Sequence, residues 1–419
     1  MGTRRVLLRW ASALAATLGL GPWRAAATQG SRASAEAVGR LRELPLRDIR
    51  RIDAAEDTGW WARDGAGRLW QVPETGPARL FAEGLDPASL LAQGHGRIAA
   101  RGLDGRLWVH EAARPASKPA RSDVPLAPHG GLCVLPLAII AVVEEAAGPV
   151  LARFEPDAGG TWRVVARSRE PVLPDAVPVA VDLDGAHGGA HIAVLAGPDA
   201  QRYPHAVLGD GIEATRLLWL ERHSLEALRT LQLAAPEVFE DRLLRPWQLP
   251  DGRTGLVTVR AGPQGAQLVV VAAARNSPAD LETAAAGPAI GTRNRWLSPA
   301  SVGPADPTLW AVHTPHIGGV LHRYRAEGAA LVAERVAERV APGLTNHRLG
   351  ARELDISARV GPWLLLPTQN WRGLRAVHTQ DNSNLEARPE GAPIEQCVAS
   401  ASRRSALLLS ASGLAVFTA

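Results

Sequence analysis

Short apolar runs alternate with polar, glycine-rich stretches along most of the chain from Leu41 onward. The clearest pair lies in residues 60–72, WWARDGAGRLWQV, and residues 98–110, IAARGLDGRLWVH. Each reads as a strand, a tight glycine turn and a second strand, with a tryptophan at the same point, Trp70 or Trp108. Convincing helical periodicity is confined to the N-terminal stretch. The pattern predicts an all-β chain built from one repeated unit.

The unit recurs at intervals of roughly 45 residues, which is the spacing of blade-like repeats. Looser copies are predicted at 133–168, 177–233, 245–283, 295–335 and 354–388. A last copy, 394–418, has room for only three strands, and the stretch 41–49 could supply the fourth. We therefore expect a single β-propeller of eight blades, closed by an N-terminal strand. Seven blades is the alternative, and a pair of β-sandwiches would not explain the uniform spacing.

One predicted blade carries a long insertion. Residues 191–195 and 216–220 read as strands, and residues 196–215 between them include Tyr203 and His205. Polar side chains on a long loop over a rigid scaffold are typical of a binding site.

The first residues predict an export signal. Residues 3–9, TRRVLLR, resemble a bacterial twin-arginine signal, and an apolar stretch to Leu20 precedes Ala25, Ala26 and Ala27, a small-residue cleavage pattern. The apolar stretch is shorter than the roughly 20 residues that span a bilayer, which argues against the alternative of an uncleaved anchor. We expect a signal peptide at 1–27, a linker at 28–40, a propeller at 41–419 and a periplasmic protein without a membrane anchor.

Charge and cysteine content narrow the class of protein. The formal charge of +4 includes four arginines within the first 27 residues, so the remaining chain is near neutral and nucleic-acid binding has no electrostatic support. Cys133 and Cys397 lie in apolar runs of distant repeats, which favours buried free thiols over a disulfide. We expect a monomer.

Residues 181–195, VDLDGAHGGAHIAVL, carry a family resemblance. They resemble the FG-GAP/VCBS repeats of integrin-like propellers, in which the acidic loop between the first two strands of a blade can bind calcium. Residues 250–252, PDG, are a weaker match. Asp182 and Asp184 remain, but Ala186 and Ala190 stand where further ligands are needed, and calcium requires six to eight oxygens. The loop is therefore expected to keep its shape without a metal.

Loops that enter the first strand of a blade and loops that join its second and third strands emerge on one face of a propeller. In the second half of the chain these loops are unusually rich in His, Arg and Glu. The candidate ligand-binding residues are Tyr203, His205, Glu240, Asp241, Arg245, Arg295, His313, His316, His347, Arg352, Glu353 and Gln369. Arg245, Arg295 and Arg352 are expected to form an arginine cluster at the channel mouth with few carboxylates beside it, which suits an anion.

Other interpretations of these residues remain open. Pairs such as Asp241 with Arg245 could be structural ion pairs between blades. Histidines 313, 316 and 347 could bind zinc, but no acidic or Cys residue stands at ligand spacing, so neither a metal nor a cofactor is expected. Nucleophile-elbow and phosphate-loop motifs are absent from the sequence.

Two functions follow from this pattern. The first is a non-catalytic periplasmic propeller that binds an anionic small molecule or a protein partner on this face. The second is a propeller enzyme, a lyase or hydrolase acting on an anionic or sugar substrate, with histidine as acid or base. Convergence of at least two of these histidines with an arginine would indicate a small-molecule site or an enzyme, whereas dispersal over the rim would indicate a binding module.

Overall fold

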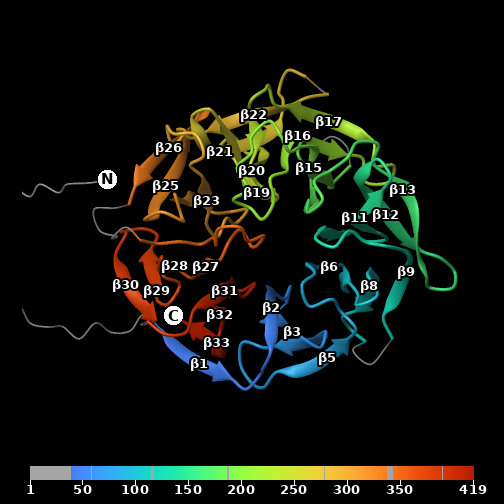
Figure 1. Cartoon of the computed structure of the whole chain (residues 1–419), viewed down its shortest axis with the longest axis horizontal. Helices are drawn as coiled ribbons and strands as arrows, with labels where there is room; N and C mark the ends of the chain where they lie inside the picture. The colour runs from blue at the N-terminus through green and yellow to red at the C-terminus, as the bar shows by residue number, and fades with distance from the viewer. Residues whose placement is uncertain are drawn as a thin grey trace, which may run out of the picture. The chain divides into compact units, whose positions relative to one another are not determined.

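The computed structural model describes residues 39–57, 59–114, 118–185, 188–277, 279–336, 343–388 and 390–419. All regular elements in these ranges are β-strands. Residues 37–419 form one compact unit, and Figure 1 shows its sheets following one another around a common axis. The predicted signal peptide and nearly all of the predicted linker lie outside the described residues.

Groups of four consecutive strands pair in antiparallel fashion. In the first half of the chain they are β2 (Ile49–Ala54), β3 (Trp60–Asp64), β4 (Arg68–Val72) and β5 (Arg79–Glu83); β6 (Leu91–Gly94), β7 (Arg97–Arg101), β8 (Arg106–Glu111) and β9 (Ala120–Pro125); and β10 (Leu132–Val134), β11 (Ile139–Glu145), β12 (Gly148–Pro156) and β13 (Trp162–Arg167). The predicted repeat is confirmed in register, because Trp70 pairs with Ala62 and Trp108 pairs with Ala100.

The second half continues the pattern with longer connections. Its groups are β14 (Val179–Val181), β15 (His191–Asp199), β16 (Glu213–Leu220) and β17 (Ala227–Gln232); β19 (Arg245–Gln248), β20 (Thr254–Gly262), β21 (Gly265–Ala273) and β22 (Leu281–Ala286); β23 (Leu297–Pro299), β24 (Leu309–His313), β25 (Val320–Glu327) and β26 (Ala330–Arg335); and β27 (Ala358–Val360), β28 (Trp363–Pro367), β29 (Leu374–His378) and β30 (Asn384–Arg388). A short strand, β18 (Val238–Phe239), pairs with both β16 and β20 and so joins two neighbouring groups.

One sheet combines both ends of the described chain. Strands β31 (Ile394–Ala399), β32 (Ser405–Ser410) and β33 (Gly413–Thr418) form a meander, and β1 (Arg40–Leu44) pairs antiparallel with β33. The predicted single strand at 41–49 is divided, because β1 ends at Leu44 and Ile49 begins β2 of the next sheet. Hydrogen bonds link these two sheets: the Ile52 amide donates to Gln396 Oε1 at 2.7 Å, and the Trp60 indole donates to the Val398 carbonyl at 2.8 Å.

Two predicted strand boundaries are wrong. Strand β15 extends to Asp199 and β16 starts at Glu213, with these two residues paired, so the loop is shorter than the predicted 196–215. The strand predicted to begin at Leu354 begins at Ala358 instead. Arg352 and Glu353 therefore lie on a long connection rather than beside an inner strand.

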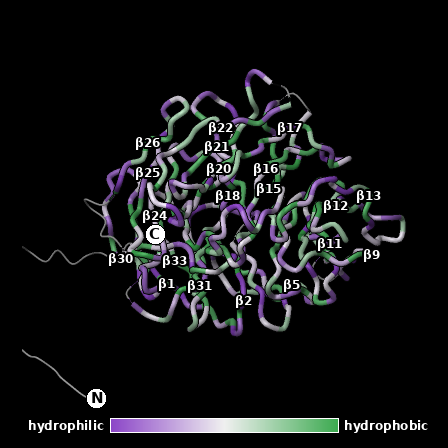
Figure 2. The backbone as a smooth tube through the Cα atoms, turned by 45° about the horizontal axis from the view of Figure 1, so that its top comes forward, coloured by the Kyte–Doolittle hydropathy of each residue, from purple (hydrophilic) through white to green (hydrophobic). Residues whose placement is uncertain are grey.

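The core lies between neighbouring sheets and along their strands. Apolar and hydrophilic stretches alternate along the chain (Figure 2), and the apolar ones form clusters shared by adjacent groups, such as β14–β17 with β10–β13. Fully buried indoles bridge sheets through their N–H groups: Trp108 donates to the Glu83 carbonyl at 3.1 Å and Trp247 to the Asp306 carbonyl at 2.7 Å. Cys133 and Cys397 are buried free thiols, as predicted.

Candidate ligand-binding site

The candidate site lies on the face formed by the connections that enter each first strand and those that join second to third strands; we call it the histidine face. Contacts between these connections hold it together. His205, on the β15–β16 connection, meets Glu240, which follows β18. His316, on the β24–β25 connection, meets His347 on the connection that leads to β27.

His205 and Glu240 form a tight side-chain pair. His205 Nδ1 lies at hydrogen-bond distance from Glu240 Oε1, while the carboxyl is fully buried and the imidazole is partly exposed. Burial, with the charge of Asp241, holds the pKa of Glu240 well above its usual range. Oε2 of Glu240 is buried and has no hydrogen-bond partner among the described residues. A carboxyl with an orphaned oxygen is far cheaper to bury as the neutral acid than as the anion.

A second buried carboxyl stands beside this pair. Ala214 is paired with Phe239, so the antiparallel register places Glu213 opposite Glu240. Burial, reinforced by the charge of Glu240, raises the pKa of Glu213 to about 10. Two adjacent carboxyls in a dry environment cannot both ionise cheaply, so each raises the pKa of the other, and Glu213 is neutral near pH 7.

His316, His347 and Trp296 form the other half of the cluster. His316 Nε2 lies 2.8 Å from His347 Nδ1, and His347 Nε2 lies 2.8 Å from the Ala351 carbonyl. The Trp296 ring stacks on His316, with ring centroids 6.0 Å apart, and its indole N–H donates to the Glu240 carbonyl. Burial lowers the pKa of each histidine to about 4, so both rings are neutral at physiological pH. Trp296 therefore contacts both halves, since its ring stacks on His316 and its N–H group donates to the backbone of Glu240.

Two exposed arginines border the cluster. The Arg295 charge contributes to a lowered pKa of His205, after burial, and the Arg293 guanidinium lies 5.7 Å from the ring centroid of Tyr203. Tyr203 is buried, and its hydroxyl accepts a hydrogen bond from the Asn294 amide at 2.9 Å. Within the described part of the chain neither arginine has a carboxylate partner. Six of the candidate residues thus lie in one region: Tyr203, His205, Glu240, Arg295, His316 and His347.

The predicted arginine cluster without carboxylates is not found. Arg245 Nη1 lies 2.7 Å from Oδ2 of Asp241, which is itself fully buried and accepts two backbone amides. Arg352 lies 2.9 Å from Asp210 and 3.5 Å from Asp175. These contacts favour the structural ion-pair interpretation for Arg245 and Arg352, because each guanidinium has a carboxylate partner.

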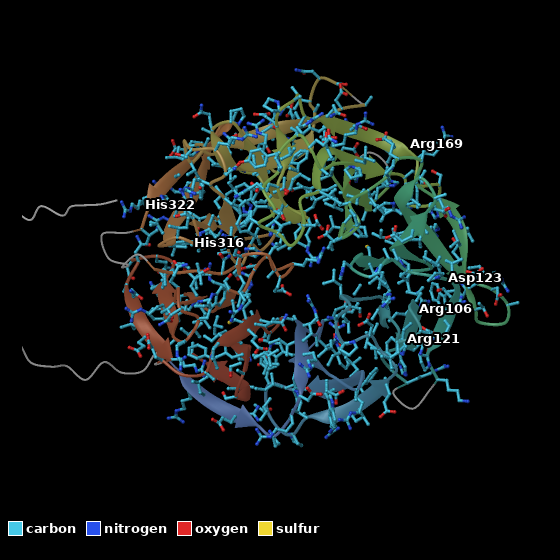
Figure 3. The ribbon with its side chains drawn as sticks, in the orientation of Figure 1. Arg106, Arg121, Asp123, Arg169, His316 and His322 are labelled. Carbon is cyan, nitrogen blue, oxygen red and sulfur yellow. The ribbon has the colours of Figure 1, made fainter. Side chains whose placement is uncertain are left out.

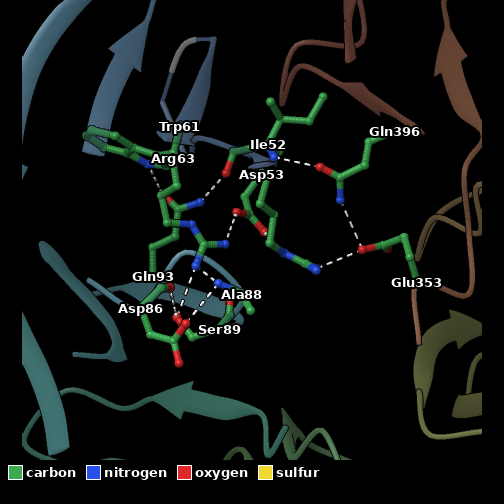
Figure 4. A network of polar contacts seen from close by, with 12 residues as sticks. Ile52, Asp53, Trp61, Arg63, Asp86, Ala88, Ser89, Gln93, Glu353 and Gln396 are labelled. Atoms are coloured by element: carbon green, nitrogen blue, oxygen red, sulfur yellow. Dashed lines mark hydrogen bonds and ion pairs between the residues drawn. The ribbon is translucent and has the colours of Figure 1, made fainter. Parts of the chain in front are cut away.

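Residues 344–357 form a segment that crosses between sheets far apart in sequence; we call it the crossing segment. The Gly350 amide donates to the Val207 carbonyl at 2.9 Å, and Arg352 reaches Asp175 and Asp210 beside β14–β16. Glu353 reaches the opposite way, 2.8 Å from Arg51 on β2 and 3.1 Å from Gln396 (Figure 4). Glu353 is therefore part of an ion-pair network with Asp53 and Arg63, not of the histidine cluster.

The remaining predicted residues have structural partners. His313 Nε2 bonds the Tyr324 hydroxyl, and its ring stacks on His322, with centroids 3.6 Å apart. Figure 3 shows His322 farther from the centre of the ring than His316. In the described ranges the contacts of His313 are with His322 and Tyr324 and not with the histidine cluster. Gln369 fixes the turn that carries His316, accepting from the Gly319 amide and donating to the Pro315 carbonyl.

In the loop that resembles a calcium site, the guanidinium of Arg229 pairs with Asp184. Asp184 Oδ2 lies 2.8 Å from Arg229 Nη2, with both side chains almost fully buried, and Asp182 Oδ1 accepts the Gly185 amide. Asp184 and Asp251, from the two loops singled out in the sequence, line one cleft of about 560 Å³. Ala186 lies outside the described residues. Among the residues described, no group of three or more His, Cys, Asp or Glu side chains is arranged to hold a metal ion.

Sequence reasoning missed several members of this face. Glu213 was assigned to a loop, although its position at the start of β16 places it against Glu240. Asp175, which lies 3.5 Å from Arg352, was also missed, because a single Asp in a proline-rich connection carries no distinctive signal. In the described ranges no helix is long and apolar enough to cross a membrane.

Comparisons with known proteins identify the fold. No protein-family model matches the sequence, and no curated protein matches it. Among solved structures, the chain is similar to BamB from Moraxella catarrhalis, with a TM-score of 0.53, 11% identity, and coverage of 91% of this chain and 98% of that one. It is also similar to AztD from Citrobacter koseri, with a TM-score of 0.51, 13% identity, and coverage of 86% and 88%. The structural neighbours are β-propellers, so the chain has an all-β propeller fold.

Proposed function

We propose that this protein is a non-catalytic, exported propeller that binds a small polar ligand at the histidine cluster, which comprises Tyr203, His205, Glu240, Trp296, His316 and His347. The observation that carries the proposal is that Trp296 joins the His205–Glu240 pair to the His316–His347 pair, beside the exposed Arg295. Dispersed side chains would instead have favoured a protein-docking rim.

Two further features support a ligand site. Glu240 buries a carboxyl oxygen without a partner, an arrangement that is costly unless it serves a function. Thr314, a β-branched residue, has a φ of 48° at the turn before His316, and such backbone strain is typical of binding sites.

Long-range ¹H–¹⁵N spectra of the histidine rings test the proposal. We would add monosaccharides, sugar acids, dicarboxylates, amino acids, phosphate and sulfate in turn to ¹⁵N-labelled protein. At least one class should shift the His205 and His316 ring signals, and should bind at least about tenfold more weakly to the His205→Ala/His316→Ala variant. Unchanged ring signals across the whole panel would rule out a small-molecule function and return the face to a protein partner.

The His205–Glu240 pair favours one alternative, a propeller enzyme. A carboxyl bonded to Nδ1 orients an imidazole with Nε2 facing outward, as general acid–base catalysis requires. To distinguish the two functions, a ligand that binds would be incubated with the protein for a prolonged period, and the ligand would then be examined by NMR. An unaltered ligand supports binding alone, whereas new products that His205→Ala fails to form support a lyase or hydrolase.

The finer architecture belongs to the same proposal. We infer eight blades, with the β31–β33 sheet completed by β1, because each group of four strands follows the last around the ring. We also propose that the Asp182–Gly185 and Asp251 turns descend from FG-GAP-type loops, and that the protein is a periplasmic monomer exported by the twin-arginine route. N-terminal sequencing of the protein recovered from a bacterial periplasm tests the export step, since cleavage is expected after Ala27.

A further inference from the structure

The hydrogen-bond chain through His347 fixes the proton positions on His316. A backbone carbonyl can only accept, so His347 Nε2 carries a hydrogen and donates to Ala351. The neutral His347 ring then has a bare Nδ1, which must accept from His316 Nε2–H at 2.8 Å. The neutral His316 ring is left with a bare Nδ1 that has no partner in the described part of the chain. His316 therefore offers a hydrogen-bond acceptor to the partly open side of the cluster.

The His205–Glu240 pair offers a hydrogen-bond donor, whereas His316 offers an acceptor. Glu240 is the neutral acid, because its second oxygen is buried without any donor and Glu213 stands beside it. Its hydroxyl donates to His205 Nδ1, so the remaining hydrogen of the neutral imidazole lies on Nε2. The His205 side chain is 21% exposed, which leaves this N–H group accessible. The two imidazoles thus offer one donor and one acceptor.

A hydroxyl group matches this combination, since it can accept from one group and donate to another. An ionised carboxylate or sulfate has no hydrogen for His316 Nδ1 and is repelled by its lone pair. Arg295 is exposed and has no carboxylate partner among the described residues, so its charge is available to an anionic group. The two histidines therefore select a hydroxyl group, whereas Arg295 selects an anionic group.

Building on the proposed binding function, we propose that the ligand is a hydroxylated carboxylic acid of the sugar-acid class. Its hydroxyl groups bind His205 Nε2–H and His316 Nδ1, and its carboxylate binds the Arg295 guanidinium.

Three probes test this assignment by calorimetry: glucuronate, glucose and succinate. Glucuronate should bind at least about tenfold more tightly than glucose, which lacks the carboxylate, and than succinate, which lacks the hydroxyls. Arg295→Ala should bring the Kd of glucuronate to that of glucose. His316→Phe keeps a ring against Trp296 but removes the acceptor, and should weaken binding of both sugars by about tenfold.

Arg169→Ala is the matched control. Arg169 is an exposed arginine paired with Glu226 at the outer edge of the ring (Figure 3), and its replacement should leave all three Kd values unchanged. Equal affinity for glucose and glucuronate, or tighter binding of succinate, overturns the assignment. If phosphate or an amino acid shifts the His205 and His316 signals and the three probes do not, the ligand class is wrong while the binding function stands. If nothing shifts those signals, both fail.

Discussion

Glu213 is a buried acid whose ionisation opposes folding. Its pKa is about 10 in the folded protein and near 4.5 in the unfolded chain. Between these values the folded state holds a proton that the unfolded state has lost, so the free energy of unfolding falls as pH rises.

We expect Glu213→Gln to stabilise the protein above pH 5, because glutamine stays neutral at no cost. Each pH unit contributes up to about 1.4 kcal/mol, so a gain of about 5 kcal/mol is expected near pH 8 and little at pH 4.5. Urea unfolding from pH 4.5 to 9 measures the difference. The same gain at every pH would show that Glu213 is not held neutral.

Histidines 316 and 347 have the opposite effect on the pH dependence of stability. Their pKa values of about 4 lie below that of an unfolded histidine, so the unfolded chain gains protons first as pH falls below about 6.5. Stability is complete above pH 6.5 and declines as pH falls toward 4. We expect their ring ¹⁵N signals to show neutral imidazoles, each protonated on Nε2, at pH 6. Protonation of either ring at that pH would contradict the fixed donor and acceptor positions.

At the scale of elements, β1 is the outer strand of a sheet made otherwise from the other end of the described chain. Deleting residues 39–46 would expose the β33 edge and part of the apolar cluster around Leu44, Leu414 and Val416. We expect a loss of several kcal/mol, with increased aggregation, measured by calorimetry and light scattering. A deletion with the parent Tm would show that the sheet is stable with three strands.

Strands were predicted well because hairpin alternation and glycine turns are local. The Trp70 and Trp108 repeats share a register, and the copy predicted at 394–418 contains three strands that span the same residues. The site was predicted less fully, because partners depend on long-range placement. Arg352 carried the same local signal as Arg295, yet one pairs with two carboxylates and the other has none. Nothing near Glu213 in sequence indicates Glu240.

At the scale of the whole molecule, the crossing segment links distant sheets through two adjacent residues. Arg352 pairs with Asp210, and Glu353 pairs with Arg51. Arg352→Ala should cost about 1 kcal/mol, since its side chain is 32% exposed and its pairs are partly screened. Hydrogen exchange should quicken at Gly350, whose amide bonds Val207. Arg169→Ala, which removes a surface ion pair, is the control. Unchanged exchange at Gly350 would show that Arg352 does not hold the segment in place.

Calcium should have little effect on stability, because Arg229 already neutralises Asp184. The Tm of chelated protein is expected to rise by less than about one degree on addition of millimolar calcium. Arg229→Ala leaves a nearly buried carboxylate without its cation, and should cost about 3 kcal/mol. A rise of several degrees in the parent protein would mean that the loop still binds the ion.

The β1–β33 pairing also sets an order of assembly. During synthesis the first strand of the ring emerges long before its partner, Gly413–Thr418, so β1 must wait unpaired while the other sheets form beside one another. The pairing of β1 with β33 therefore comes last and brings together the two ends of the described chain, and contacts between segments so far apart in sequence are slow to form. Until then β33 has an exposed edge, and molecular chaperones have most reason to bind the protein at that stage.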